Sequence, residues 1–362
     1  MKILIENATI VTLRESEPII EQGYIYINKG VIASLGKGPP PPELELAEYV
    51  IDGRGRVVLP GFVIGVGDIL EYVFRFYDVE RCRLIEVLSK GEIQALLEVA
   101  LTSLAMRGAT SLVTITKEEH FKYLPRAVST SWIRTRIVIE GVEHLDEALR
   151  HVQREVSEQD AIAKGIVSIG VRYDGCDAST LERIEASSSY AYVCKGDPLQ
   201  IRKIIEERKL RRVILINPAQ ALDLRSVFTD GRIVKGHGVG FEDPTKLSPH
   251  LFLYEVYNKL GSYIETIEAA IKWNAQNFDI GIASIVEGVP ADIVIYSYRE
   301  PPSGPIPMST NGLFKAIVLG ELKVDTVIIG GDVVVDNGEP LMVGRATFKK
   351  AMNVVEELRS KK

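Results

Sequence analysis

The sequence predicts an α/β protein in which a central parallel sheet is accompanied by a small β-sandwich made from both ends of the chain. Three observations lead to this prediction. Residues 1 to about 56 carry strand and turn patterns only, residues from about 62 to 280 alternate strand and helix patterns, and the last third returns to strand patterns. Repeated strand–helix units imply a parallel sheet, which is closed as a barrel or left open.

Composition limits the class of protein and its partners. The chain of 362 residues is long enough for one large and one smaller domain, and its net charge of −6 argues against a nucleic acid or an anionic membrane as partner. No apolar run reaches the roughly 20 residues that a membrane span requires, and the N-terminus lacks a signal-peptide pattern. Cys82, Cys176 and Cys194 lie far apart, which fits a reducing cytosol, so we expect a cytoplasmic protein. Abundant Ile and Val with scarce Gln would suit a thermophile.

The stretch from Val57 to Val66 contains no polar side chain. It is broken by the turn-forming pair Pro60-Gly61, and it leads to a carboxylate at Asp68. Such a run predicts a strand that is buried on both faces, as in a parallel sheet. Strands that precede it are expected at residues 3–10, 24–27, 31–35 and 48–51.

Helix start signals and short apolar runs divide the rest of the chain. The helix starts are marked by the capping-box pairs Ser89–Glu92, Ser179–Glu182 and Ser262–Glu265, and by Asp197 followed by Pro198. Central strands are expected at residues 111–116, 135–139, 166–171, 190–193, 213–216 and 232–234. Later strands are expected at 293–296, 326–329 and 333–335, before a last helix from about Arg345 to Arg359.

Three motifs together resemble the amidohydrolase superfamily, and they cover nearly the whole chain. They are Pro60-Gly61-Phe62-Val63, similar to the start of its first barrel strand; Ile285 to Val294, similar to its Gly-x-Ile-x-x-Gly-x-x-Ala-Asp signature; and Val327 to Gly338, similar to its closing hairpin. The chain looks most like the chlorohydrolase and aminohydrolase branch, which includes guanine and cytosine deaminases.

The resemblance implies a TIM-like (β/α) barrel at residues 59–282. It also implies a composite β-sandwich from residues 1–58 and 283–345, and the remaining residues, 346–362, form a C-terminal helix. Homodimerisation is a habit of the family and is expected on that ground.

The resemblance further implies a metal site, whose residues this chain does not keep. In that branch Zn²⁺ or Fe²⁺ is held by two histidines of strand 1, by histidines of strands 5 and 6 and by an aspartate of strand 8. The strand-1 positions are Val66 and Asp68 here, and the later positions align with Cys194, Asn217 and Glu242. We therefore expect no metal cofactor, with Zn²⁺ or Fe²⁺ bound by Asp68, Cys194 and Glu242 as the alternative.

Other polar residues follow the expected strands, at the end of a barrel where active sites are built. Asp197 aligns with a catalytic Glu of the family, but its place before Pro198 favours a role as the cap of the helix that follows it. A His237–Glu242 or a His237–Asp174 pair would provide acid–base chemistry without a metal. The strand-end residues expected in the cleft are His120, Tyr173, Asp174 and His237.

The spacing between Asn217 and Glu242 predicts an irregular barrel. One parallel crossover takes a dozen or more residues, and about 25 residues hold only one comfortably. Strand 7 or its helix should therefore be missing or vestigial, which makes the barrel distorted or incomplete.

Two functional hypotheses follow. The leading one is a degenerate relative, a pseudoenzyme that binds a small nitrogenous or carboxylate ligand or serves as an assembly partner. The alternative is an active hydrolase of non-peptide carbon–nitrogen bonds, deaminase-like or amidase-like, with an unusual metal site or a metal-free acid–base pair. A cleft filled by side chains such as Phe62, Tyr192 or Phe241 would favour the first hypothesis.

Overall fold

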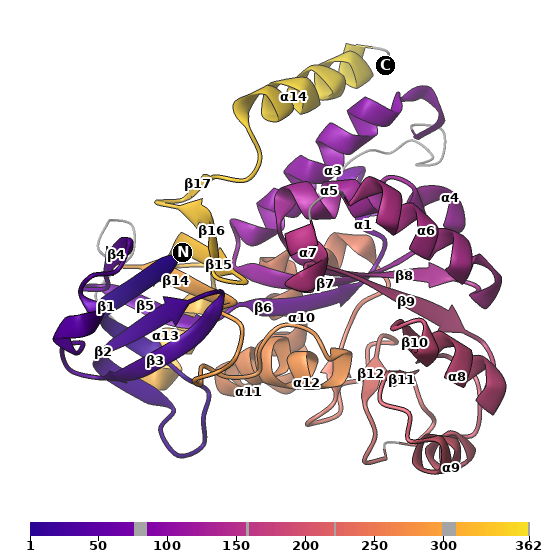
Figure 1. Cartoon of the computed structure of the whole chain (residues 1–362), viewed down its shortest axis with the longest axis horizontal. Coiled ribbons are helices and arrows are strands. Elements are labelled where there is room, and N and C mark those ends of the chain that lie inside the picture. The colour runs from indigo at the N-terminus through magenta and orange to yellow at the C-terminus, as the bar shows by residue number, and fades with distance from the viewer. Residues whose placement is uncertain (76–84, 157–158, 221, 299–308, 361–362) are drawn as a thin grey trace. The chain divides into compact units, whose positions relative to one another are not determined.

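The computed structural model describes residues 1–75, 85–156, 159–220, 222–298 and 309–360 (Figure 1). Within it the chain forms two compact units, each assembled from three separate segments. The first unit comprises residues 1–63, 104–111 and 248–341, and the second comprises residues 64–103, 112–247 and 342–362. Cys82 lies outside the described residues.

The first unit holds a nine-stranded mixed sheet in the order β17-β16-β15-β14-β5-β1-β2-β3, with β4 paired to β1. Strand β1 pairs in parallel with β4 and β5, and the other pairs are antiparallel. The strands are β1 (Lys2–Val11), β2 (Ile19–Asn28), β3 (Val31–Lys37), β4 (Tyr49–Asp52), β5 (Arg56–Pro60), β14 (Ile293–Ser297), β15 (Lys323–Ile329), β16 (Asp332–Asp336) and β17 (Glu339–Pro340).

This sheet joins the two ends of the chain, as predicted. Strand β5 from the N-terminal part pairs with β14 from the C-terminal part. Strand β3, at one end of this order, also meets the segment that leads into β14. The Ile32 amide donates to the Val289 carbonyl at 2.9 Å, and the Ala291 amide donates to the Gly30 carbonyl at 2.9 Å.

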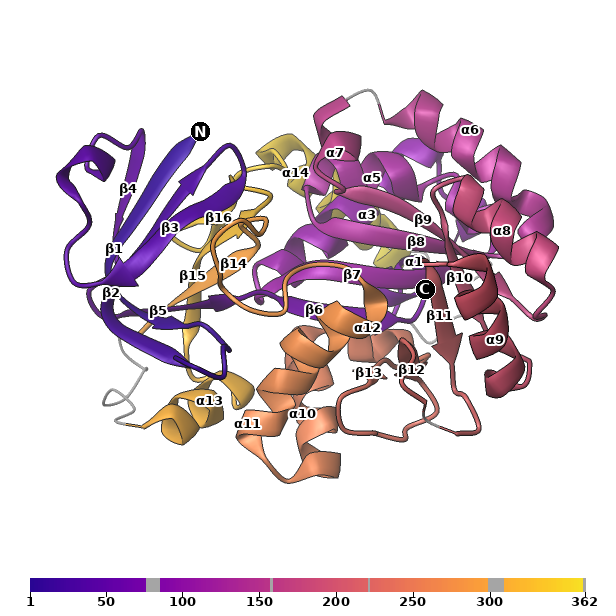
Figure 2. The same cartoon turned by 60° about the horizontal axis from the view of Figure 1, so that its bottom comes forward.

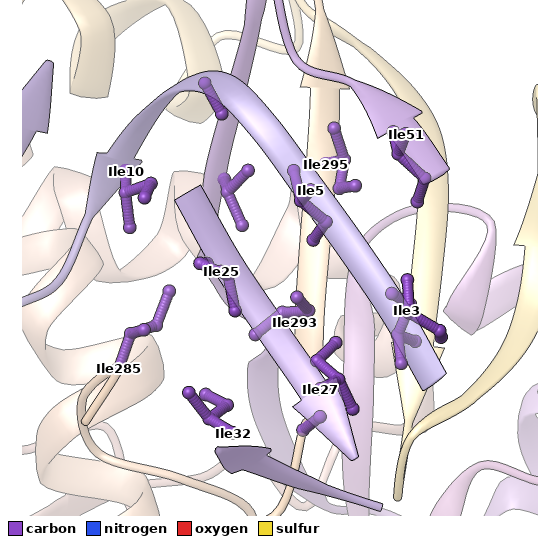
Figure 3. Packing of buried hydrophobic residues seen from close by; sticks show 14 of the residues in the cluster. Ile3, Ile5, Ile10, Ile25, Ile27, Ile32, Ile51, Ile285, Ile293 and Ile295 are labelled. Atoms are coloured by element: carbon purple, nitrogen blue, oxygen red, sulfur yellow. The ribbon is translucent and has the colours of Figure 1, made fainter. Parts of the chain in front are cut away.

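Isoleucine dominates the core inside this sheet. β-branched side chains suit strands, where they pack against neighbours on the same face. Figure 3 shows isoleucines of β1 and β2 pointing toward those of β14 and of neighbouring loops. The isoleucines of this cluster that are completely buried include Ile3, Ile5, Ile10, Ile25, Ile27, Ile32, Ile285, Ile293, Ile295 and Ile328.

Helices of the first unit follow residue 248. They are α10 (Pro249–Leu260), α11 (Tyr263–Glu268), a π-helical turn at Ala269–Trp273, α12 (Asn274–Phe278) and α13 (Thr310–Val318), with a short 3₁₀ turn at Pro42–Leu44. The predicted cap at the start of α11 is confirmed, since the Ser262 hydroxyl accepts from the Glu265 amide at 3.3 Å.

The apolar run that begins at Val57 is divided between two sheets rather than forming one strand. Its first half is β5, its second half is β6 (Phe62–Val66), and the two are separated at Gly61. A Cβ atom on Gly61 would lie only 2.1 Å from the Thr110 side chain, so the chain can pass this point only with glycine.

The second sheet is an eight-stranded sheet in the order β13-β12-β11-β10-β9-β8-β7-β6, and β6 and β7 begin in the first unit and end in the second. The pairs from β8 to β13 are parallel. Its first and last members meet at a parallel bridge between Val66 and Phe241, with hydrogen bonds of 2.9–3.1 Å on both sides. The predicted (β/α) barrel is therefore confirmed. After β6, the strands are β7 (Ala109–Thr116), β8 (Arg134–Glu140), β9 (Val167–Tyr173), β10 (Tyr190–Val193), β11 (Val213–Ile216), β12 (Ser226–Phe228) and β13 (Gly238–Val239).

Helices connect the first strands of the barrel and lie outside them, as α6, α8 and α9 do beside β8–β11 in Figure 2. The capping box at Ser89 and Glu92 is confirmed by two reciprocal bonds, whereas Asp177 rather than Ser179 caps α8. The helices of this unit are α1 (Ile69–Val73), α3 (Lys90–Ala105), α4 (Glu118–Phe121), α5 (Leu124–Ser131), α6 (Leu145–Glu155), α7 (Gln159–Ala163), α8 (Ala178–Ala186), α9 (Pro198–Arg208) and α14 (Arg345–Ser360), with 3₁₀ turns at Val142–His144 and Pro244–Leu247.

Irregularity is concentrated between β11 and β13, where the prediction of a vestigial seventh strand holds. Strand β12 has three residues, and the described residues on either side of it, up to β11 and β13, contain no helix. The strand expected at residues 232–234 is wrong. The buried Val227 and Phe228 form the strand instead, while Arg232 is exposed.

None of the helices that the structure describes is long and apolar enough to cross a membrane.

Candidate active site

A cleft lies at the carboxyl ends of the barrel strands, within the second unit. Its inner part is a cavity of about 140 Å³ whose wall includes Asp68, Lys117, Arg172 and Glu242. An outer cavity of about 530 Å³ shares Glu140 and Arg172 with it, and continues over Tyr173 and Asp174. Together the two volumes are in the usual range for small-molecule sites.

The barrel interior is filled at the level of Tyr192, which is completely buried. The Tyr192 ring has room because it lies against Gly170 of β9, where a Cβ atom would be 2.8 Å from the ring. Phe62 and Phe241 are buried as well. The cleft at the strand ends nevertheless remains open. These three side chains therefore do not fill it, as they would in the scaffold hypothesis.

Asp68 and His120 form a buried pair in the cleft wall. Asp68 caps α1 by accepting from the Leu70 amide at 2.8 Å. Its other oxygen lies 3.0 Å from His120 Nδ1 and accepts from the Thr116 hydroxyl at 3.0 Å. Asp68 and His120 are 9% and 3% exposed, so the carboxylate is held by three partners away from bulk water.

Arg172 is the cation at the centre of the cleft. It lies on β9, which starts deep in the barrel and ends at the mouth, and it pairs with Glu140 at 3.6 Å. Burial lowers the pKa of the Arg172 guanidinium, but the neighbouring Cys194, Glu140 and Glu242 outweigh burial, and the pKa is raised overall. The guanidinium is therefore a permanent positive charge beside two carboxylates.

Cys194 lies beside this guanidinium, which donates a hydrogen bond to its sulfur. Burial raises the pKa of the Cys194 thiol, and Arg172 only partly opposes this effect. The thiol also contacts the Tyr192 carbonyl at 3.7 Å. Cys194 is thus a protonated, half-buried thiol at neutral pH.

Glu242 is connected to two preceding strands through side chains. Asn217, which follows β11, donates from Nδ2 to the Thr229 hydroxyl at 2.9 Å and accepts from the Thr229 amide at 2.7 Å. The Thr229 hydroxyl in turn lies 3.3 Å from Glu242 Oε1. Glu242 is exposed toward the cleft and directly follows Phe241, whose bridge to Val66 closes the barrel.

The other predicted site residues have different surroundings. Asp174 pairs with Lys195 at 2.6 Å, and the Tyr173 hydroxyl donates to Asp177. Burial and this bond to Asp177 raise the pKa of Tyr173. Asp197 caps α9 by accepting from the Leu199 amide at 3.1 Å, as its alternative interpretation predicts.

His237 stands apart from the carboxylates that are its expected partners. Its ring packs edge-on against Phe228, with centroids 5.9 Å apart. Burial lowers its pKa, which Asp223 partly opposes, and its Nδ1 is buried without a hydrogen-bond partner among the described residues. Within that part of the chain, no hydrogen bond or ion pair joins His237 to Glu242 or Asp174, and the carboxylate that acts on its pKa is Asp223.

Sequence reasoning missed Arg172, Thr229 and Thr116. A signal existed for Arg172, because it comes directly after the strand expected at 166–171 and two residues after Gly170, and alternate residues of a strand share a face. Thr229 and Thr116 carried no such signal, since a threonine at the end of an apolar run or just after it is common.

The described residues do not fit a metal ion. No group of three or more His, Cys, Asp and Glu side chains in the described part of the chain is arranged to hold one. Both oxygens of Asp68 already accept hydrogen bonds, and Cys194 lies beside the Arg172 guanidinium, whose positive charge opposes the binding of a cation there.

Several solved structures are similar to this chain over nearly its whole length. Atrazine chlorohydrolase TrzN from Arthrobacter aurescens TC1, complexed with zinc, matches 98% of this chain and all of its own at 14% identity and a TM-score of 0.73. An adenosine deaminase from Xanthomonas campestris with bound zinc matches with a TM-score of 0.70 at 11% identity, over 99% of this chain and 98% of its own. An amidohydrolase from a Sargasso Sea environmental sample matches with a TM-score of 0.66 at 15% identity, over 100% and 99%. The chain has the amidohydrolase fold.

Sequence comparison reaches a shorter part of this amidohydrolase-fold chain. A 5-methylthioadenosine/S-adenosylhomocysteine deaminase from Halalkalibacterium halodurans is 40% identical over 63 residues, which is 17% of this chain and 14% of the relative. The corresponding deaminase from Bacillus anthracis is 43% identical over 63 residues, with the same coverage. The match therefore spans about one seventh of the length of these curated relatives. No protein-family model matches the chain.

Proposed function

We propose that this protein hydrolyses non-peptide carbon–nitrogen bonds of small nitrogenous molecules at the mouth of the barrel. The observation that carries the proposal is the convergence of Glu242, Arg172 and the Asp68–His120 pair on one cleft at the strand ends. Support for the reaction class comes from the deaminases among the similar proteins. These relatives favour an active hydrolase over a catalytically silent relative.

In this proposal the side chains of the cleft carry out the chemistry without a metal. Two of the similar structures contain zinc. Zinc sites in enzymes use at least three protein ligands, and in this chain Asp68, Cys194 and Glu242 would have to supply them. The first two already have other hydrogen-bond partners, and the Arg172 charge beside Glu242 opposes a second cation there.

Glu242 is the general base in this proposal. It takes a proton from a water molecule held in the inner cavity, and the resulting hydroxide attacks the carbon of the carbon–nitrogen bond. Arg172 donates hydrogen bonds to the atom of the substrate that gains negative charge during this attack. Protonated Glu242 then gives its proton to the leaving nitrogen, so that the carbon–nitrogen bond breaks and ammonia or an amine departs.

Asp68 and His120 have an orienting role. The carboxylate is fixed in the cavity wall by three bonds, and it is therefore suited to hold a substrate N–H in position. The outer cavity accommodates the rest of the substrate.

The test is an ammonia-release assay on the purified full-length chain, with amides, ureas and aminated nitrogen heterocycles as substrates. Each is measured with a chelator and with added Zn²⁺. We expect turnover in the presence of the chelator and a fall of about 10²- to 10⁴-fold in kcat for Glu242→Gln. Glu206→Gln is the matched control, because Glu206 is an exposed carboxylate on α9 that pairs across one helical turn with Arg202.

Turnover that appears only with Zn²⁺ would overturn the metal-free chemistry and leave the reaction class standing. Saturable binding of a compound without turnover under either condition would overturn the hydrolase and favour a ligand-binding protein.

A further inference from the structure

We infer that Asn217 and Thr229 position Glu242, in place of the helical connections that this part of the barrel lacks. The inference rests on the proposed role of Glu242 as general base. It concerns the segment from β11 to β13, where the described connections contain no helix and the strands have two to four residues.

Asn217 continues the β11–β12 ladder with its side chain. The ladder pairs Leu215 with Ser226 and Ile216 with Val227. The backbone N–H of Asn217 then donates to the Val227 carbonyl at 2.9 Å. At Asn217 the backbone turns away with a φ of 47°, a left-handed conformation that asparagine tolerates better than most residues. The side chain takes over from the backbone and bonds Thr229 twice.

The direction of these hydrogen bonds is fixed. The Thr229 amide can only donate, so the oxygen of Asn217 must face it and Nδ2 must face the Thr229 hydroxyl. Because that hydroxyl oxygen accepts from Nδ2, its own proton is free to point to Glu242, whose Oε1 accepts it. The donor chain therefore runs from Asn217 through Thr229 to Glu242.

The chain of bonds also settles where Glu242 lies. Thr229 is 7% exposed, and it follows directly on β12, which is paired to β13. The Gly240 amide binds the Phe228 carbonyl at 3.0 Å, and Phe241 closes the barrel against Val66. The Glu242 backbone is thus anchored on one side and Oε1 of its carboxylate on the other, which leaves the second oxygen for the chemistry in the inner cavity.

Three substitutions separate positioning from folding. Thr229→Val removes the hydroxyl at nearly constant shape, and Thr229→Ser keeps it. Asn217→Asp keeps the acceptor for the Thr229 amide but removes the donor, so the Thr229 hydroxyl turns to the introduced carboxylate and away from Glu242. The control is Thr245→Val, since the Thr245 hydroxyl bonds Asp243 in the same part of the chain.

We expect Thr229→Val and Asn217→Asp to lower kcat by about 10- to 100-fold, the size expected when one hydrogen bond to a charged group is lost, with KM changed little. Thr229→Ser should restore kcat to within a few-fold of the unsubstituted protein, and Thr245→Val should leave it unchanged. A kcat for Thr229→Val equal to that of the unsubstituted protein would overturn the inference.

Crystal structures of the unsubstituted protein, Thr229→Val and Thr229→Ser provide a readout that does not need turnover. The Glu242 carboxylate should leave its place, or spread over several rotamers, in the valine variant only. If the unsubstituted protein has no hydrolase activity, the proposed function fails, yet this structural result would still decide whether Asn217 and Thr229 hold Glu242. An unmoved Glu242 in the valine variant would overturn the inference whatever the activity.

Discussion

The isoleucine cluster of the first unit and the barrel of the second unit bury different kinds of side chain. The buried residues of the cluster are isoleucine, valine and alanine, whereas the barrel and its mouth bury Asp68, His120, Thr116, Arg136 and Tyr192. Burying aliphatic carbon stabilises a fold directly, but burying charge and hydroxyl groups costs free energy unless each finds a partner. The isoleucine cluster therefore stabilises its unit directly, whereas each buried polar group of the barrel needs a partner.

The two cores also differ in how their partners are found. An isoleucine needs only apolar neighbours, and many different contacts will serve. Asp68 needs the Leu70 amide, Thr116 and His120 at once, and those partners come from three separate elements. Loss of one of them leaves a buried group unsatisfied, so polar interiors tolerate fewer substitutions.

The largest expected effect is on the isoleucine core. Ile25→Ala should lower the free energy of unfolding by about 2–5 kcal/mol, because Ile25 is completely buried and the cavity left behind cannot collapse fully. Urea unfolding followed by circular dichroism measures this. Val50→Ala in the same sheet is the control, since Val50 is 49% exposed and should lose little. Equal losses at both positions would contradict the description of this core.

Local features of this fold could be predicted from the sequence, and nonlocal ones could not. The caps at Ser89, Asp197 and Ser262 depend on residues two or three positions away, so their patterns are visible in a single stretch. The cap of α8 is Asp177, two residues before the predicted Ser179. The prediction chose Ser179 because Ser179 and Glu182 also have the spacing of a capping box. The barrel itself follows from the resemblance, since strand–helix alternation alone fits an open sheet as well.

The candidate site divides in the same way. His120 is expected in the cleft because every strand end of a barrel faces the same opening, but its bond to Asp68 joins residues 52 positions apart. Asn217 and Glu242 align with family positions, and their connection needs Thr229, which no pattern marks. The sequence favours a strand at 232–234 because Ile233 and Val234 are apolar and β-branched, whereas the strand forms in the buried segment around Val227.

An intermediate effect is expected inside the barrel. Gly170→Ala would place a methyl group 2.8 Å from the Tyr192 ring and 3.1 Å from Val138, and overpacking of this kind costs about 1–3 kcal/mol of unfolding free energy. Gly344→Ala is the control, because nothing lies within 4 Å of a Cβ atom there. The two variants are compared by urea unfolding. If Gly170→Ala proved as stable as Gly344→Ala, the barrel interior would have room that the structure does not give it.

The smallest expected effect is on the pH dependence of the free energy of unfolding, to which His237 of the second unit contributes. The buried residues of the isoleucine cluster are all aliphatic, whereas His237 in the second unit is partly buried against Phe228 and its pKa is lowered by that burial, with Asp223 opposing. In the unfolded chain a histidine titrates near about 6.5. Below that pH the unfolded chain binds a proton that the folded protein still excludes, so the free energy of unfolding rises with pH in this window. The contribution of His237 is fully present above about pH 6.5 and is lost as the pH falls toward the lower folded-state pKa.

Urea unfolding at several pH values between about 5 and 8 should give a flatter pH dependence for His237→Phe than for the unsubstituted protein. The phenylalanine ring preserves the packing against Phe228, so a difference in slope reports the proton and not the contact. Identical slopes would mean that His237 is as well solvated when folded as when unfolded, and the pH dependence of stability would then have to be sought in other groups.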